Sequence, residues 1–435
     1  MTPAAPVAPA RPPVVAGGLA PAAGSIRLAG EHFVAATLYL VAGALGLLWV
    51  APELAGGAYL SPHVAGVTHL FTLGWLTMTV FGALCQLLPV ALGTPVRSTG
   101  AAHAAFLAFA PGVGLFAAGV ATNRTMLHHA GILLVAAAVL LVTANVGAAL
   151  PRARTRDVTW AAIALALGFL ASTLVLGIIL LHNLHTGFMG EARVRVLAIH
   201  LHVAIVGWLL IMIVGVSHRL LPMFLLSHGA DTSWTRRALA LLASGVVALG
   251  TGLALQQPVA AWSGAVLLLA GLACFFRQAH AFYRGRVRKK IDVGMRFAAT
   301  ALVFLGTSAL LGLTVLATGA SHPRLATAYV TVGLLGGIVL YVIGFFYKIV
   351  PLLAWTARFR GRMGKEPVPT VAQLYSARLA HVQLGLMAGG VVILTAGIAT
   401  GSAHAARCGA LLFLSGVLVF IAQLGRVARG RGAWA

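Results

Sequence analysis

The sequence predicts an all-α polytopic membrane protein with about 12 transmembrane helices in three parallel four-helix pseudo-repeats. Composition is the first reason, because 60% of the 435 residues are hydrophobic and only 9% are charged, too few for the surface of a soluble protein. The second is the length of the apolar runs, which reach the roughly 20 residues that a helix needs to cross a bilayer. The third is a motif that recurs about every 130 residues, as expected for a repeated architecture.

The apolar runs divide the chain into a tail and a membrane domain. Residues 1–28 are rich in Ala, Pro and Gly and lack the apolar region of a cleaved signal peptide, so we expect a disordered tail. Residues 29–435 are expected to form a single transmembrane domain. The predicted spans are 31–54, 63–92, 98–121, 125–150, 157–182, 195–226, 234–255, 258–283, 292–317, 323–355, 373–400 and 402–426.

Positive charge is concentrated in alternate connections. The formal net charge is +23, with 30 Lys and Arg against 7 Asp and Glu. Basic residues follow the even-numbered spans, at Arg152, Arg154, Arg156, Arg236, Arg237, Arg284, Arg286, Arg288, Lys289, Lys290, Arg358, Arg360, Arg362, Lys365, Arg426, Arg429 and Arg431. By the positive-inside rule both termini are expected in the cytoplasm, with the protein in a bacterial inner membrane. This distribution indicates the lipid bilayer, and not nucleic acid, as the partner of the basic residues.

The recurring motif combines glycines, a polar residue and a proline at fixed spacing. Small residues let helices approach closely in a membrane, and proline bends a helix and frees a carbonyl group. Packing therefore explains the glycines and prolines but not the histidines. The three copies are His69, Gly74, Trp75, Gly82 and Pro89; His202, Gly207, Trp208, Gly215 and Pro222; and Thr331, Gly336, Gly344 and Pro351, with Gln86, Arg219 or Lys348 four residues after the second motif glycine.

A second similarity sets the boundaries of the pseudo-repeats. The segments that begin at Gly131, Gly264 and Gly409 resemble one another in length and in their basic ends. They close three units, 29–156, 157–291 and 292–435, each with the motif in its second span. Because each unit has an even number of spans, the units have the same orientation and are related by an axis along the membrane normal.

Three histidines lie inside apolar sequence near the outer side of the predicted membrane: His69, His200 and His202. A polar side chain there needs a partner, and imidazole is a common metal ligand. His200 and His202 point about 200° apart on a regular helix, so they can serve two centres on opposite sides. We predict that these three residues bind haem or metal. The alternative is that they hydrogen-bond between helices.

Other candidates lie at the ends of spans on the same side. His128, His129, His182 and His185 can complete a second metal site, although histidines are ordinary at a membrane surface. Trp75 and Trp208 are expected near the motif histidines, where they would pack either on a macrocycle or in the protein core.

With twelve spans, three arcs and histidines on spans 2 and 6, the chain resembles the haem-copper oxidase subunit I superfamily. The stretch from His200 to Pro222 is similar to proteins described as cbb3-oxidase-subunit-I-like, and the size and span number are similar to those of the NnrS family of haem- and copper-containing membrane proteins. The resemblance implies a b-type haem with His69 and one of His200 and His202 as axial ligands, and a second haem or a copper ion beside the other. The chain departs from the oxidases at span 10, which has Thr331 in place of histidine.

The leading hypothesis is a membrane protein that binds haem and that can also bind copper. Its role would be electron transfer, the handling of nitric oxide or oxygen, or the assembly of an oxidase. A cytochrome or other respiratory subunit is then an expected partner. Proton pumping is not expected, because the 7 acidic residues lie near span ends or in loops. A secondary transporter or metal or haem permease without a redox cofactor is the alternative, and a structural assembly partner is a third. Whether the protein is an enzyme, in which case it would be an oxidoreductase, is left open.

Overall fold

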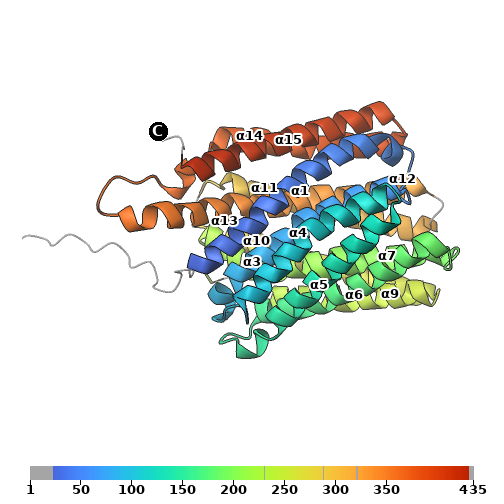
Figure 1. Ribbon diagram of the computed structural model, residues 1–435, viewed down its shortest axis with the longest axis horizontal. Helices are drawn as coiled ribbons and strands as arrows, with labels where there is room; N and C mark the ends of the chain where they lie inside the picture. Colours follow the sequence, from blue (N-terminus) through green and yellow to red (C-terminus); the bar gives the residue numbers. More distant parts are fainter. Residues whose placement is uncertain (1–22, 230, 288, 320–321, 431–435) are drawn as a thin grey trace, which may run out of the picture.

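The computed structural model describes residues 23–229, 231–287, 289–319 and 322–430, which form a bundle of helices (Figure 1). The first four spans contain α1 (Ala23–Ala55), α2 (Pro62–His69), η1 (Leu70–Thr77), α3 (Met78–Leu87), η2 (Leu88–Leu92), α4 (Thr99–Ala121), α5 (Thr125–Gly147) and the short η3 (Leu150–Arg152). The next four contain α6 (Val158–Thr186), α7 (Ala192–His202), η4 (Val203–Leu210), α8 (Ile211–Leu225), α9 (Ser233–Ala254) and α10 (Pro258–Arg284). The last four contain α11 (Val293–Thr318), α12 (Pro323–Thr331), η6 (Val332–Val339), α13 (Leu340–Phe359), η7 (Arg360–Arg362), η8 (Val371–Leu374), α14 (Ala377–Thr400) and α15 (Ala403–Arg429).

The predicted number of spans is confirmed. Among the described residues, 12 helical stretches are long and apolar enough to cross a membrane, so the chain is an all-α integral membrane protein. The tenth stretch ends at Arg362 and not at the predicted residue 355, because α13 continues to Phe359 and η7 follows it. The predicted tail lies mostly outside the described residues, and α1 begins within it, at Ala23.

The helices run side by side along one axis, so the bundle has two ends (Figure 1). We call one the histidine end; it carries the turns at residues 122–124 and 187–191. The other, the basic end, carries the end of α8, the start of α9, the end of α10, the start of α11 and both described ends of the chain. Six of the twelve spans in the described part of the chain begin at a polar side chain that accepts a backbone N–H group which the helix leaves free. These caps are Ser61, Ser98, Asp157, Asp292, Ser376 and Ser402.

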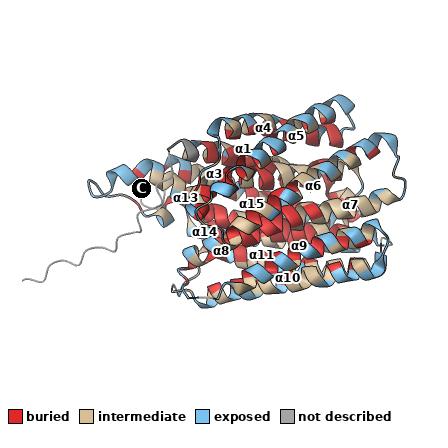
Figure 2. Ribbon diagram, turned by 90° about the horizontal axis from the view of Figure 1, so that it is seen from below, coloured by how far each residue is buried: buried red, intermediate tan, exposed pale blue. Residues whose placement is uncertain are grey.

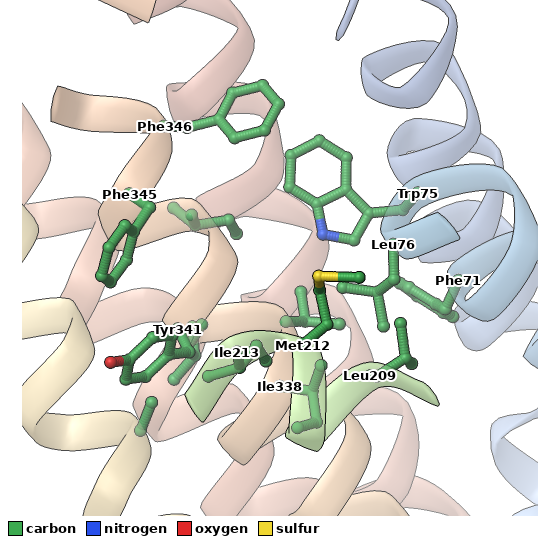
Figure 3. Packing of buried hydrophobic residues seen from close by; sticks show 14 of the residues in the cluster. Phe71, Trp75, Leu76, Leu209, Met212, Ile213, Ile338, Tyr341, Phe345 and Phe346 are labelled. Atoms are coloured by element: carbon green, nitrogen blue, oxygen red, sulfur yellow. The ribbon is translucent and has the colours of Figure 1, made fainter. Parts of the chain in front are cut away.

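The motif-bearing spans meet in the centre of the bundle. Buried residues concentrate there, and exposed residues lie on the outer helices (Figure 2). Figure 3 shows the contact region, where an indole, a thioether and several aromatic and aliphatic side chains fill the space between the three spans. The labelled residues are Phe71, Trp75 and Leu76 from the second span, Leu209, Met212 and Ile213 from the sixth, and Ile338, Tyr341, Phe345 and Phe346 from the tenth.

Each motif-bearing span contains a π-helical segment. The segments η1, η4 and η6 start immediately after His69, His202 and Thr331, the first positions of the three motif copies. A π-helical turn holds more residues than an α-helical turn, so it changes the direction of the side chains that follow it. The orientation of the histidines relative to the core below them therefore depends on these segments.

The first motif glycine in each span lies against an aromatic residue of the preceding span. A Cβ atom added at Gly74, Gly207 or Gly336 would lie 2.5, 2.6 or 2.5 Å from the ring carbon Cγ of Tyr39, Phe169 or Phe304, respectively. Real Cβ atoms do not approach so closely, so only glycine fits without a shift of the neighbour. The predicted role of these glycines in close helix packing is confirmed.

Six of the remaining nine spans pair as antiparallel hairpins, α4 with α5, α9 with α10, and α14 with α15. An amide side chain near the basic end of each hairpin hydrogen-bonds the backbone of the loop before its first helix. Asn145, Gln278 and Gln423 donate to the carbonyl oxygens of Ser98, Asp231 and Ser376 at 2.8, 2.9 and 2.6 Å. All three amide residues are buried. We call these contacts the amide clamps.

Candidate metal centre

Three histidines meet at the histidine end. His128 and His129 lie in the first turn of α5, and His185 lies in the last turn of α6. Each offers one ring nitrogen, and these nitrogens all lie within 4.8 Å of one another. His128 is fully buried, whereas His129 and His185 are exposed. The cluster therefore has one fixed ligand and two ligands that can adjust.

Close packing of α4 against α5 fixes His128. Gly119 approaches so closely that an added Cβ would lie 2.3 Å from the His128 backbone nitrogen. The carbonyl of Gly119 lies 3.5 Å from Nδ1 of His128, so Nε2 points toward His185. The two Nε2 atoms of His128 and His185 are 2.6 Å apart. At this distance one ring donates a hydrogen bond to the other, and a proton lies between them.

The same three nitrogens suit a transition metal. Imidazole nitrogens bind zinc at about 2.0–2.1 Å in a tetrahedral arrangement, which places two ligand nitrogens about 3.3 Å apart. His128 and His185 would thus separate by about 0.7 Å, a movement that an exposed side chain at a helix end can make. Binding displaces the shared proton, because a metal ligand must be unprotonated. Three imidazoles leave a fourth position open, and they suit zinc, copper, iron or nickel.

The structure brings together three of the four histidines predicted for this second site. His182 is exposed and contacts Phe188, with 5.4 Å between ring centroids, and it takes no part in the cluster. The sequence signal was a histidine pair at the start of one span and a histidine in the last turn of the next. Which of His182 and His185 faces the pair depends on the rotation of α6, which the sequence alone does not give.

The motif histidines lie deeper, at the start of the π-helical segments. Nδ1 of His69 donates to the carbonyl of Ala65 at 2.8 Å, and Nδ1 of His202 donates to that of Ala198 at 2.7 Å. These bonds fix both rings with the proton on Nδ1 and the lone pair on Nε2. Nε2 of His202 accepts from the hydroxyl of Tyr329 at 3.1 Å, whereas no described residue hydrogen-bonds Nε2 of His69.

His200 differs from both. Its Nδ1 is buried without a hydrogen-bond partner. An added Cβ at Gly177 of α6 would lie 3.3 Å from its Cε1. His200 thus lies toward α6, whereas His202 lies toward Tyr329 of α12. The predicted opposite orientation of His200 and His202 agrees with these contacts.

The helix that carries these two histidines is packed more loosely than its counterparts. No residue of α7 is buried, whereas α2 buries Val64, Gly66 and Val67, and α12 buries Thr327, Ala328 and Thr331. His69, His200, His202 and Tyr329 all keep partial exposure although they lie within the bundle. The neighbouring helices therefore do not fully cover the motif histidines.

The two motif tryptophans are core residues. Trp75 is fully buried and packs against Phe346, with 4.7 Å between ring centroids, and its Nε1 has no partner. Trp208 is also buried and donates from Nε1 to the hydroxyl of Thr77 at 3.0 Å. These contacts agree with the alternative in which Trp75 and Trp208 pack in the protein core and not on a macrocycle.

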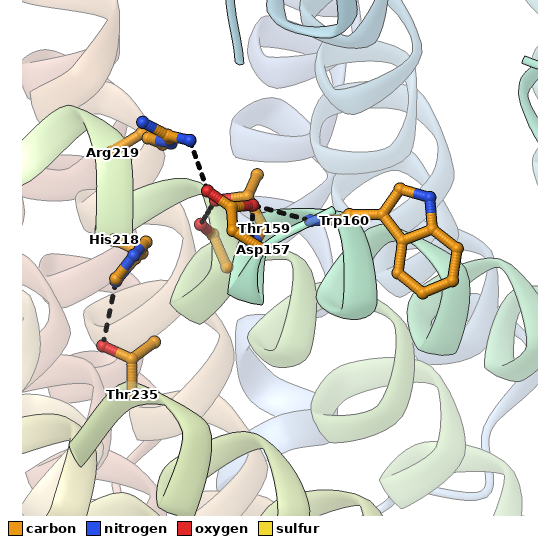
Figure 4. Close-up of polar contacts among 7 residues, drawn as sticks. Asp157, Thr159, Trp160, His218, Arg219 and Thr235 are labelled. Atoms are coloured by element: carbon orange, nitrogen blue, oxygen red, sulfur yellow. Dashed lines mark hydrogen bonds and ion pairs between the residues drawn. The ribbon is translucent and has the colours of Figure 1, made fainter. Parts of the chain in front are cut away.

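At the basic end, polar contacts explain the cation that follows the second motif glycine. Asp157 caps α6 by accepting from the backbone N–H groups of Thr159 and Trp160, and its other oxygen pairs with Arg219 (Figure 4). Nδ1 of His218 lies 3.3 Å from the hydroxyl of Thr235 in the same region. Lys348 pairs with the cap Asp292 at 2.6 Å in the same manner. These residues join helices and do not form a metal site.

No protein-family model matches the chain, and no curated protein is significantly similar to it. The function is therefore argued from the site itself.

Proposed function

We propose that the protein is a transition-metal-binding integral membrane protein whose metal centre is formed by His128, His129 and His185. The observation that carries this proposal is the convergence of three imidazole nitrogens within 4.8 Å, from two helices, with one ring buried. Uncharged imidazoles at a helix end suit copper or zinc better than magnesium or calcium, which prefer oxygen ligands.

Metal analysis tests this centre. The protein, purified in mild detergent, is loaded with Cu²⁺ or Zn²⁺ and freed of unbound metal. We expect one equivalent per chain, and a loss of affinity of more than about tenfold in His129→Ala or His185→Ala, because each removes a ligand. Metal is released as the pH falls, since protons compete for the imidazole nitrogens.

His182→Ala is the matched control, because His182 is an exposed histidine on the same helix, outside the cluster. It is expected to leave metal binding unchanged. If His182→Ala and His185→Ala weaken binding equally, or if neither does, the centre is not at this cluster.

We further propose that the motif histidines hold a b-type haem between the second and sixth spans, as in the haem-copper oxidase-like superfamily. The free Nε2 of His69, the unpartnered Nδ1 of His200 and the loose packing of α7 support this proposal. His69 and His200 would be the axial ligands, and the carbonyl of Ala65 would orient the His69 ring. Haem supplies one-electron redox chemistry when bound. Electron transfer, nitric oxide or oxygen handling, and oxidase assembly with a respiratory partner are compatible roles.

An optical spectrum tests the haem. Protein made under haem-sufficient conditions is expected to show a reduced b-type α-band that His69→Ala or His200→Ala abolishes. His381→Ala is the control, because His381 is exposed near the basic end and its Nδ1 bonds the carbonyl of Ala377. A colourless protein would contradict the haem proposal and leave the outer metal centre to be judged by its own analysis.

We infer that the three groups of four spans are parallel pseudo-repeats. The π-helical segments η1, η4 and η6, the glycine–aromatic contacts and the amide clamps occur at corresponding positions in all three groups, which supports this inference. The charge distribution supports a cytoplasmic basic end, which would place the metal centre on the outer face of a bacterial inner membrane.

A further inference from the structure

A groove of about 450 Å³ lies between α10 and α11, where the second predicted unit meets the third. Its lining is mostly apolar and includes Phe276, His280 and Tyr283 from α10 and Ala299, Leu302 and Val303 from α11. Its volume is in the range of sites for small ligands. The groove occupies the half of these two spans nearest the basic end, and it is open to the surface of the bundle.

A loop rich in Arg and Lys begins directly after Tyr283, the last groove residue of α10. Arg284, Lys289 and Lys290 are exposed and form no ion pair among the described residues. Arg286 donates to the carbonyl of Tyr283 at 2.6 Å, which ties the loop to the wall of the groove. Arg286 Nε and the nearby Ser227 hydroxyl are buried without partners. The loop therefore presents unpaired positive charge at the end of the groove.

The acidic residues nearby are already engaged. Asp292 pairs with Lys348 at 2.6 Å, and Glu366 pairs with Arg362. Asp231 accepts hydrogen bonds from the backbone and hydroxyl of Ser233, which hold the pKa of its carboxyl below the usual range. No described carboxylate forms an ion pair with Arg284, Arg286, Lys289 or Lys290.

The polar groups of the groove are few. Tyr283 donates its hydroxyl to the carbonyl of Met295 at 2.5 Å, so that hydroxyl is not available to a ligand. His280 is the remaining titratable group in the lining. An apolar chain fits such a wall, because Thr307, the other polar residue of the lining, donates its hydroxyl to the carbonyl of Val303.

We propose that this site binds one anionic phospholipid, with an acyl chain in the groove and the phosphate on the loop of Arg284, Arg286, Lys289 and Lys290. Basic pockets between spans at the cytoplasmic surface recognise anionic headgroups by charge. The site is independent of both proposed metal centres.

Native mass spectrometry of delipidated protein, with phosphatidylglycerol or phosphatidylcholine added, tests the proposal. We expect selective retention of phosphatidylglycerol. The triple variant Arg284→Gln, Lys289→Gln, Lys290→Gln is expected to bind phosphatidylglycerol with an affinity that is roughly tenfold to hundredfold lower, because each cation near an anionic headgroup contributes to binding. Gly306→Leu is expected to lower it as well, because an added Cβ there points at Phe276 across the groove, 3.3 Å from its ring.

The matched control is Arg152→Gln, Arg154→Gln, Arg156→Gln, which removes the same charge from another loop at the basic end. If this control variant retains phosphatidylglycerol, and if every variant has an unchanged apparent Tm, the result supports the proposed lipid site. Equal loss in both triple variants would show a general surface-charge effect and overturn the proposal. Unchanged binding in Gly306→Leu, or retention of an isoprenoid quinone in place of phosphatidylglycerol, would overturn it too.

Discussion

At the scale of single residues, the histidines illustrate what a sequence can and cannot predict. Their level in the membrane follows from their position in apolar runs, and His128, His129 and His185 indeed lie at one end of the bundle. The identity of the residues that meet depends on helix rotation and on the close approach of Gly119 to His128. These are tertiary features, and one sequence contains no local signal for them.

The two motif tryptophans allow a matched test of a buried hydrogen bond. Both are buried, but only Trp208 has a partner for Nε1, the hydroxyl of Thr77. Trp208→Phe should therefore lower stability by about 1–2 kcal/mol more than Trp75→Phe, because it also leaves the Thr77 hydroxyl unpaired. Thermal unfolding in one detergent measures the difference. Equal losses would mean that this bond contributes nothing net.

At the scale of elements, the spans were predictable and the π-helical segments were not. Each span carries its own hydrophobic signal, so the sequence predicts twelve, and twelve are found in the part of the chain that the structure describes. The segments η1, η4 and η6 are more apolar than the α-helices on either side, but a continuous apolar run is compatible with either type of helix. A wide turn depends on packing against neighbouring spans, so hydropathy carries no sign of it.

Helix approach can be tested with one added methyl group. Gly207→Ala places a Cβ 2.6 Å from Phe169 Cγ, close to the backbone, where the ring cannot swing clear. We expect a loss of about 1–3 kcal/mol from overpacking. Gly168→Ala on α6 meets no atom within 4 Å and is the control. The apparent Tm and the monodisperse fraction after gel filtration report the effect; a stable Gly207→Ala protein would show that α6 moves away freely.

At the scale of the whole molecule, the orientation in the membrane is an expectation from the charge distribution alone and is open to direct test. A fluorescent protein fused after Ala435 should fold and fluoresce in the bacterial cytoplasm, because the basic end is expected there. Alkaline phosphatase fused after Gly190, in the turn between α6 and α7, should be active, since that enzyme needs the oxidising side. The reverse pattern would place the metal centre on the cytoplasmic face.

The amide clamps also bear on how the chain assembles during synthesis. Each joins residues 47 positions apart, so a clamp can close as soon as its own hairpin has left the ribosome and entered the membrane. The central contacts join distant parts of the chain, as in Trp208 to Thr77 across 131 positions and Tyr341 to Ser217 across 124. Local contacts form before distant ones. The hairpins are thus expected to be complete early, and the core between the motif spans to close only after the tenth span is inserted.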